Sequence, residues 1–158
     1  MKHKQIFNYS SAIIFFLLFF ISLSCEFQFA QTLKVSKSFG KLEVKIIGFE
    51  NNKGDCWFAL DNSEEVYESE DKVWIGKILP IENKKVVVIL DSLNYGEYAV
   101  RVFHDENKNG ELDTDFLGIP DEDYGYSNDA SGWFGPPSWD KAKFIFNKPA
   151  MTITINID

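Results

Sequence analysis

Oxygen-bearing side chains recur at short, regular intervals near the middle of this chain. The stretch DENKNGELDTD, which begins at Asp105, has Asp or Asn at its first, third, fifth, ninth and eleventh positions, and Gly110 is its sixth residue. Alternate side chains of a tightly curled loop point to its inside, and a glycine permits the sharp reversal that such a loop needs. Carboxylate and amide oxygens in this arrangement are the ligands that a hard cation prefers. The spacing therefore predicts a calcium site.

The predicted ligand set has six members. Four contribute side chains, one contributes its backbone carbonyl, and the last shares its position with water: Asp105, Asn107, Asn109 and Asp113, then Glu111, then Asp115. Phe116 stands where the helix-loop-helix calcium hand has a bidentate Glu, so we expect a weak affinity, on the order of 10⁻⁴ to 10⁻³ M, and a static structural ion. The alternative is an Asx-rich turn without metal, in which these side chains bond their own backbone.

Two residues near the loop could suggest catalysis. His104 directly precedes Asp105, but adjacent residues of a strand face opposite sides, so the two do not form a dyad. No Ser or Cys motif supplies a nucleophile. We therefore expect no enzymatic activity, with His104 capping its strand or bonding to the loop backbone, and with Cys56 as a buried, inert thiol in an apolar strand.

Aromatic residues gather after the acidic stretch. They are Tyr124, Tyr126, Trp133, Phe134 and Trp139. Flat aromatic faces beside carboxylates and amides can hold a carbohydrate or a peptide, which makes this cluster a second candidate site. The alternative is a satellite core, because a loop that runs from Asp105 to Pro137 needs packing of its own.

The elements that position these residues are predicted to be strands. Residues 42–46 and 151–157 alternate apolar and polar side chains with a period of two, which is typical of half-buried strands. Further strands are expected over residues 54–60, 73–79, 85–91, 97–104 and 143–147. After the N-terminal segment no stretch has convincing helical periodicity. The pattern predicts an all-β chain, folded as an antiparallel two-sheet β-sandwich with one long loop.

The N-terminus is expected to direct export. Lys2, His3 and Lys4 precede an apolar run from Ala12 to Leu23, whereas a membrane-spanning helix needs roughly 20 apolar residues. We expect a signal peptide over residues 1–30 and a single domain over residues 31–158, without a transmembrane segment in the mature chain. The location would be periplasmic or extracellular. Lipidation at Cys25 is the alternative to cleavage after Ala30.

The charge of the chain excludes nucleic acid as the expected partner. Residues 31–158 have 14 basic and 23 acidic residues, which gives a net charge of −9. Binding to phosphate backbones requires a basic patch, whereas the acidic residues here concentrate between Asp105 and Asp123. One cysteine remains in this span, so the fold has no internal disulfide and must depend on its core, helped by a metal if one binds.

Part of the chain resembles a known family. The resemblance rests on the run from Tyr98 to Asp113, on the short pieces LGIP and YGYSN that follow, and on GPPS from Gly135. In these residues the chain is similar to an uncharacterised family of exported bacterial proteins, the domain of unknown function 2141. The family usually has Pro-Gly before the Tyr-Ala strand, where this chain reads Tyr95-Gly96. The resemblance implies an immunoglobulin-like or transthyretin-like β-sandwich and leaves the function open.

Three hypotheses follow. The first is an exported, non-catalytic β-sandwich module with a calcium-stabilised acidic loop and an aromatic ligand-binding surface. The second is a hydrolase that uses carboxylates of the acidic loop, although calcium loops supply the same residues. The third is a structural protein of the cell envelope, with an envelope protein as its partner.

Overall fold

The computed structural model describes residues 38–69, 71–133 and 135–158. The predicted signal peptide, with Ala30 and Cys25, lies outside the described residues, and so does Phe134. Everything below concerns the unit from Ser38 to Asp158.

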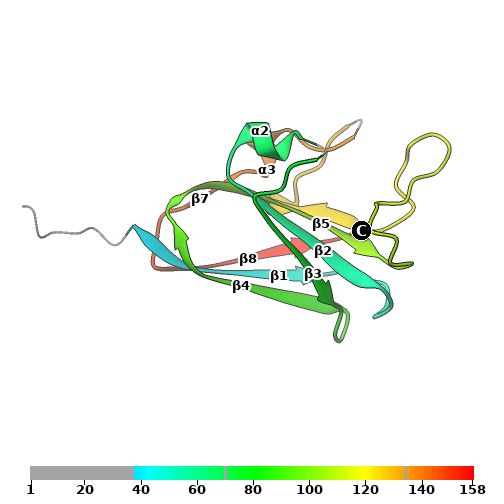
Figure 1. Ribbon diagram of the computed structural model, residues 1–158, viewed down its shortest axis with the longest axis horizontal. Coiled ribbons are helices and arrows are strands. Elements are labelled where there is room, and N and C mark those ends of the chain that lie inside the picture. Colours follow the sequence, from blue (N-terminus) through cyan, green and yellow to red (C-terminus); the bar gives the residue numbers. More distant parts are fainter. Residues whose placement is uncertain (1–37, 70, 134) are drawn as a thin grey trace, which may run out of the picture. The chain divides into compact units, whose positions relative to one another are not determined.

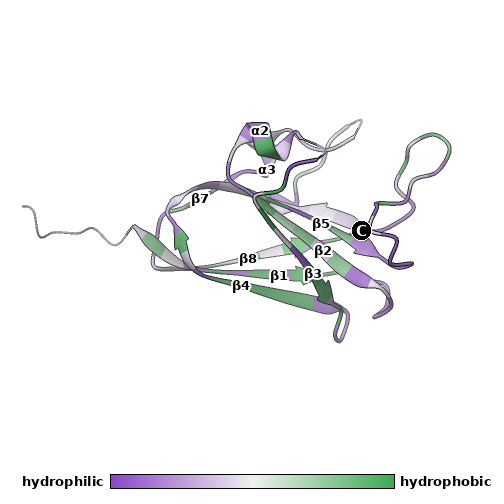
Figure 2. Cartoon of the chain, in the orientation of Figure 1, coloured by the Kyte–Doolittle hydropathy of each residue, from purple (hydrophilic) through white to green (hydrophobic). Residues whose placement is uncertain are grey.

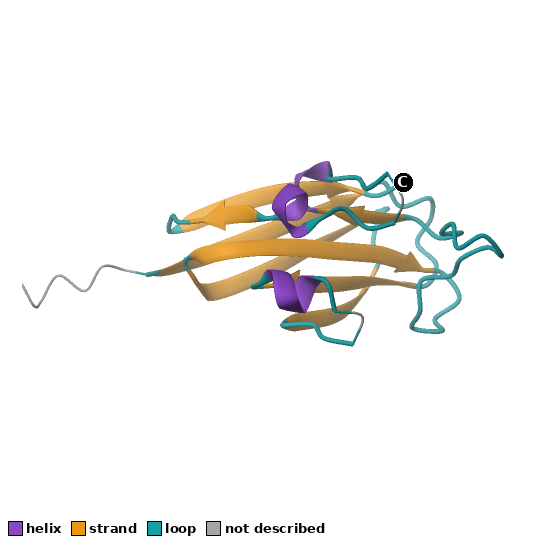
Figure 3. Cartoon of the chain, turned by 90° about the horizontal axis from the view of Figure 1, so that it is seen from above, coloured by secondary structure: helices purple, strands orange, loops and turns teal. Residues whose placement is uncertain are grey.

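Two sheets form the domain, as the alternation predicted (Figure 1). The first sheet has the order β4-β1-β8, with β1 at Phe39–Ile47, β4 at Lys85–Asn94 and β8 at Ala150–Asn156. The second has five strands in which β3-β2-β5-β6 are neighbours and β7 also pairs with β5. These are β2 at Asp55–Asp61, β3 at Ile75–Pro80, β5 at Gly96–Asp105, β6 at Tyr124–Tyr126 and β7 at Phe144–Phe146. Three short helical turns complete the domain: α2 at Glu64–Tyr67, η1 at Ser127–Asp129 and α3 at Trp139–Ala142 (Figure 3). The prediction of an all-β, two-sheet sandwich is confirmed.

One strand pair departs from the expected antiparallel arrangement. β8 lies parallel to β1, with Lys41 opposite Ala150 and Ile47 opposite Asn156, whereas the other paired strands are antiparallel. Alternation fixes which face of a strand is buried, but it carries no information about the direction of the neighbouring strand. The prediction of purely antiparallel sheets is therefore wrong for the first sheet, which is mixed.

The core lies between the inner faces of the two sheets. From the first sheet, Leu42, Val44 and Ile46 are fully buried, and from the second, Cys56 and Leu60 are fully buried as well. Hydrophobic residues accordingly recur along the strands, while the connecting segments are largely hydrophilic (Figure 2). The prediction that the Cys56 thiol is buried is confirmed, and this burial raises its pKa to about 12.

A satellite cluster packs on the outer side of β5. It consists of Tyr67, Ala99, Trp139 and Ala142, with Tyr126 and Ala130 against it. Ser63 caps α2 through its side chain and thereby positions Tyr67, whose hydroxyl donates to the carbonyl of Pro137 at 2.9 Å. The cluster anchors the segment that returns from the long loop.

An ion pair lies beside this cluster. Arg101 Nε donates to Oδ2 of the fully buried Asp61 at 2.7 Å, and the guanidinium lies 5.6 Å from the centre of the Tyr67 ring. The pair compensates a carboxylate that would otherwise be buried without a counter-charge.

Among the residues that the structure describes, none forms a helix with the length and apolar character needed to cross a membrane.

Candidate metal centre in the acidic loop

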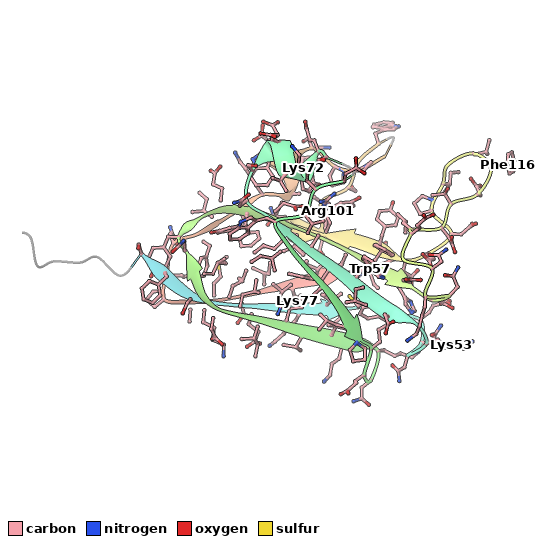
Figure 4. The ribbon with its side chains drawn as sticks, viewed as in Figure 1. Lys53, Trp57, Lys72, Lys77, Arg101 and Phe116 are labelled. Atoms are coloured by element: carbon pink, nitrogen blue, oxygen red, sulfur yellow. The ribbon has the colours of Figure 1, made fainter. Side chains whose placement is uncertain are left out.

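The acidic loop is anchored by Asp105, the last residue of β5. This carboxylate is 2 % exposed. Its Oδ2 accepts hydrogen bonds from Trp57 Nε1 and from the backbone N–H of Gly110, both at 2.9 Å, and its Oδ1 accepts from the backbone N–H of Asn109 at 3.1 Å. Three donors therefore compensate the buried charge and fold the loop back over the end of the strand. Figure 4 labels Trp57, which β2 contributes to this arrangement.

Two Asx turns curl the loop tightly. Asn107 Oδ1 accepts from the N–H of Asn109 at 2.9 Å, and Asn109 Oδ1 accepts from the N–H of Glu111 at 2.8 Å. Gly110 has φ +84°, and a Cβ there would lie 3.2 Å from Trp57 Cζ2. The reversal predicted at Gly110 is present.

Side chains of the curled loop converge on Asp113. Asn107 Nδ2 donates to its Oδ2 at 2.5 Å, and Asn109 Nδ2 donates to its Oδ1 at 2.9 Å. Because Asp105 holds the N–H of Asn109, four of the six predicted ligands form one hydrogen-bonded network. These four are among the six residues that the spacing predicted to converge.

The other two predicted ligands lie elsewhere. The Glu111 side chain is exposed and outside this network, and the predicted role of this residue is through its backbone carbonyl. Asp115 Oδ1 accepts from the N–H groups of Leu117 and Ile119 at 2.8 and 2.9 Å, so this carboxylate closes a separate turn. Asp115 therefore lies outside the hydrogen-bonded network of the other four residues, and water remains the alternative for the last position.

Glu122 is a structural member of the loop that the spacing did not reveal. Its Oε1 accepts from the N–H of Glu106 at 2.9 Å and its Oε2 from the N–H of Asp113 at 3.1 Å. The carboxylate thus clamps two distant points of the loop. In the sequence its only signal is membership of an acidic run, since its partners are backbone groups.

The loop borders a hollow of about 400 Å³ with an acidic lining. Its wall consists of Glu50, Glu106, Asn107, Asp113, Thr114, Asp121, Glu122 and Asp123. Six carboxylates in one depression attract cations and repel anions. Within the described residues, however, no three His, Cys, Asp or Glu side chains are grouped closely enough to form a metal site by themselves. Any cation in the curled loop would depend on the asparagine amides as well.

His104 lies beneath the loop as a buried structural residue. Its ring is 1 % exposed, packs edge-on against Phe49 and places Nε2 2.8 Å from the carbonyl of Lys53. Because that carbonyl can only accept, Nε2 must donate to it. Nδ1 lies 3.9 Å from Glu106 Oε1. The histidine thus bonds to backbone, as expected, although the partner belongs to the β1–β2 connection and not to the acidic loop.

The aromatic candidates separate into different environments. Tyr124 and Tyr126 lie together on β6 with ring centres 5.9 Å apart, and they line a hollow of about 370 Å³ with Asp129 and Asn156. Burial, assisted by Tyr124, raises the pKa of Tyr126 above its ordinary value of 10.0.

Trp133 and Trp139, the other aromatic candidates that the structure describes, do not line that hollow. Trp139 is 6 % exposed within the satellite cluster, whereas Trp133 is 91 % exposed. Of the aromatic candidates that the structure describes, only Tyr124 and Tyr126 therefore share one surface, because Trp139 packs inward in the satellite cluster.

Comparison with known proteins matches one family model over residues 44–154, described as uncharacterised protein conserved in bacteria, domain of unknown function 2141. No curated protein and no solved structure gave a significant match.

Proposed function

We propose, for a chain that belongs to this family of uncharacterised bacterial proteins, an exported, non-catalytic β-sandwich module whose acidic loop binds a structural calcium ion. The observation that carries the proposal is the convergence of Asn107 and Asn109 on the carboxylate of Asp113, at the foot of a loop anchored by Asp105.

The chemistry of the donor set fits calcium after one local change. Asn107 and Asn109 direct Nδ2 toward Asp113, and a half-turn of each amide would direct Oδ1 there instead. The N–H of Asn109 would keep Asp105 as its acceptor, so among the backbone donors only the N–H of Glu111 would lose its bond, and the ion would replace the two amide N–H groups that now donate to Asp113. Asp113 and the two amides would then hold the ion, with the Glu111 carbonyl and water.

Charge supports a weak, static site. One carboxylate and two neutral amides face the convergence point, while Asp105 is already satisfied by three N–H donors. Low ligand charge gives low calcium affinity, on the order of 10⁻⁴ to 10⁻³ M, which suits an extracellular or periplasmic setting. The ion would stabilise the loop and would not act as a switch.

The hydrolase alternative receives less support. Both carboxylate oxygens of Glu122 accept backbone N–H bonds, so this side chain is occupied in holding the loop together. The hollow beside Tyr124 and Tyr126 supports a binding role better, since aromatic faces with a carboxylate and an amide suit a carbohydrate or a peptide.

The first prediction concerns calcium. Millimolar calcium should raise the melting temperature of the protein over the value in chelator, because the ion binds only the folded loop. Asp113→Asn should abolish this shift. Asp140→Asn, which changes a carboxylate outside the loop, should retain it. Differential scanning calorimetry measures the shift, and a wild-type midpoint that does not respond to calcium would rule out the site.

Export is tested on the same protein. The mass of the chain recovered from the producing bacterium distinguishes cleavage after Ala30 from lipidation at Cys25, and an unprocessed chain in the cytoplasm would contradict export.

A further inference from the structure

The acidic loop ends in an exposed apolar tip. Phe116 is 93 % exposed, Leu117 68 % and Ile119 58 %. Figure 4 labels Phe116 at the far end of the loop, directed away from the sheets. Three large apolar side chains within four residues form a contiguous convex patch, which folding within one chain leaves in water.

Hydrogen bonds hold the tip in this exposed form. Asp115 Oδ1 accepts from the N–H groups of Leu117 and Ile119, and the N–H of Asp115 donates to the carbonyl of Ile119 at 2.8 Å. Gly118, at φ +79°, donates its N–H to the carbonyl of Asp115 at 2.9 Å. The turn is thus closed from both sides, and its apolar side chains are presented outward by a defined structure.

A second apolar protrusion lies on a separate segment. Trp133 is 91 % exposed between η1 and α3. In Figure 1 the segment before α3 and the tip of the acidic loop rise beyond the same side of the five-stranded sheet, the side that carries α2. A flat lipid surface can meet both exposed segments at once. Tryptophan is also the residue that membrane interfaces favour.

The negative charge around the tip affects which lipid headgroups could bind there. From position 109 to position 140 the sequence has eight acidic residues and no Lys, Arg or His. Figure 2 shows the base of the loop hydrophilic and its outer part more hydrophobic. Anionic headgroups would therefore be repelled unless a divalent cation lies between them and the loop.

We infer that the Phe116–Ile119 tip is a membrane anchor that inserts its apolar side chains into a lipid surface, with calcium at the acidic base of the loop bridging to anionic headgroups. The bridge rests on the proposed calcium site. The tip supplies apolar burial, and the ion removes the repulsion that would otherwise keep the tip away.

The test is co-sedimentation of the purified mature chain with phosphatidylcholine vesicles, with and without phosphatidylserine. Binding to the phosphatidylserine vesicles is expected with millimolar calcium and not in chelator, whereas any weaker binding to phosphatidylcholine alone should not depend on calcium. Phe116→Ser combined with Leu117→Ser and Ile119→Ser should weaken binding by about tenfold or more. Ile78→Ser and Ile145→Ser, which change other exposed isoleucines, are the matched controls and should bind as wild type.

The calcium-dependent melting shift separates the two proposals. If calcium raises the melting temperature of wild type and of the triple variant alike, yet wild type does not bind phosphatidylserine vesicles, the anchor is overturned and a protein with a basic-rimmed cavity becomes the partner to seek. Binding that is equal in chelator, or unchanged in the triple variant, overturns it too. Absence of the melting shift would overturn the calcium site and the calcium bridge that rests on it. The comparison of wild type with the triple variant on vesicles would then decide on the tip alone.

Discussion

At the scale of single residues, Trp57 connects the strand scaffold to the acidic loop. Its indole N–H is one of three donors to the buried carboxylate of Asp105, and its ring stacks on Phe103 with centres 5.7 Å apart. Trp57→Phe retains a stacking ring but leaves a buried charge with one donor fewer. We expect a loss of about 1–3 kcal/mol in the free energy of unfolding, measured by urea denaturation.

Trp74→Phe is the control for this prediction. Trp74 also stacks on an aromatic ring, that of Tyr98, and its indole makes no hydrogen bond among the described residues. Its replacement should change stability less. Equal losses in the two variants would show that indole packing, and not the bond to Asp105, stabilises the loop.

The buried Cys56 thiol makes the stability of the folded protein depend on pH. The thiol ionises near its ordinary pKa of 9.0 in the unfolded chain but only near 12 in the folded one, because burial disfavours the thiolate. Above pH 9 the folded state therefore binds more protons than the unfolded state, and stability falls as pH rises, by at most about 1.4 kcal/mol per pH unit. Below that pH this contribution is fully present.

Cys56→Ala isolates that contribution. Burial also raises the pKa values of Tyr67, Tyr98 and Tyr126, but these groups act alike in both proteins. The stability difference between wild type and Cys56→Ala should therefore shrink from about pH 8 to about pH 10. A difference that is constant with pH would mean that the thiol ionises as readily in the folded protein.

At the scale of elements, alternation predicted seven of the strands well. The fully buried Leu42, Val44 and Ile46 lie on the face that the sequence assigned to the core. β6 was not predicted, because it has three residues and its Gly125 gives no apolar signal. The single turn of α2 is likewise too short to show helical periodicity, and it depends on the cap at Ser63.

In the acidic loop, too, the sequence predicts contacts between residues close in the chain but not those that depend on the folded structure. Spacing predicted that Asn107, Asn109 and Asp113 would meet, since a curled loop with a glycine reversal has few arrangements. It could not predict that Asp115 closes its own turn or that Glu122 clamps the loop. Those roles depend on backbone N–H groups whose positions exist only after folding.

The hairpin between β3 and β4 contains a turn whose two central residues both have positive φ, which costs stability. Asn83 and Lys84 occupy the two central positions with φ 53° and 58°, between the bridged Glu82 and Lys85. Such a turn favours Asn-Gly, since a side chain other than that of Asn is strained at positive φ. Lys84→Gly should raise the free energy of unfolding by about 0.5–1 kcal/mol, because its N–H can still donate to Asn52.

Lys85→Gly tests the same change one position further, inside β4. There the backbone is extended, so glycine should lower stability by roughly 0.5–1 kcal/mol in the same denaturation experiment. Two changes of equal sign would refute the assignment of strain to the turn.

At the scale of the whole molecule, charge is the dominant asymmetry. The chain has a net charge of −8, and six carboxylates surround the hollow beside the acidic loop. Ordinary salt should therefore stabilise the protein, because the Debye length falls from about 10 Å at 0.1 M to about 3 Å at 1 M and the repulsion falls with it. The melting temperature should rise by a few degrees over this range, and calcium should add a further shift at constant ionic strength.

Glu50→Gln locates the repulsion within the molecule. Removing one of the six charges should raise the melting temperature at low salt and leave it nearly unchanged at high salt. Glu64→Gln is the matched control, since Glu64 lies in the first turn of α2, where an acidic side chain interacts favourably with the helix dipole. It should not stabilise the protein at low salt. Equal stabilisation by both changes would assign the salt effect to net charge in general, whereas stabilisation by Glu50→Gln alone places it at the hollow where a cation would bind.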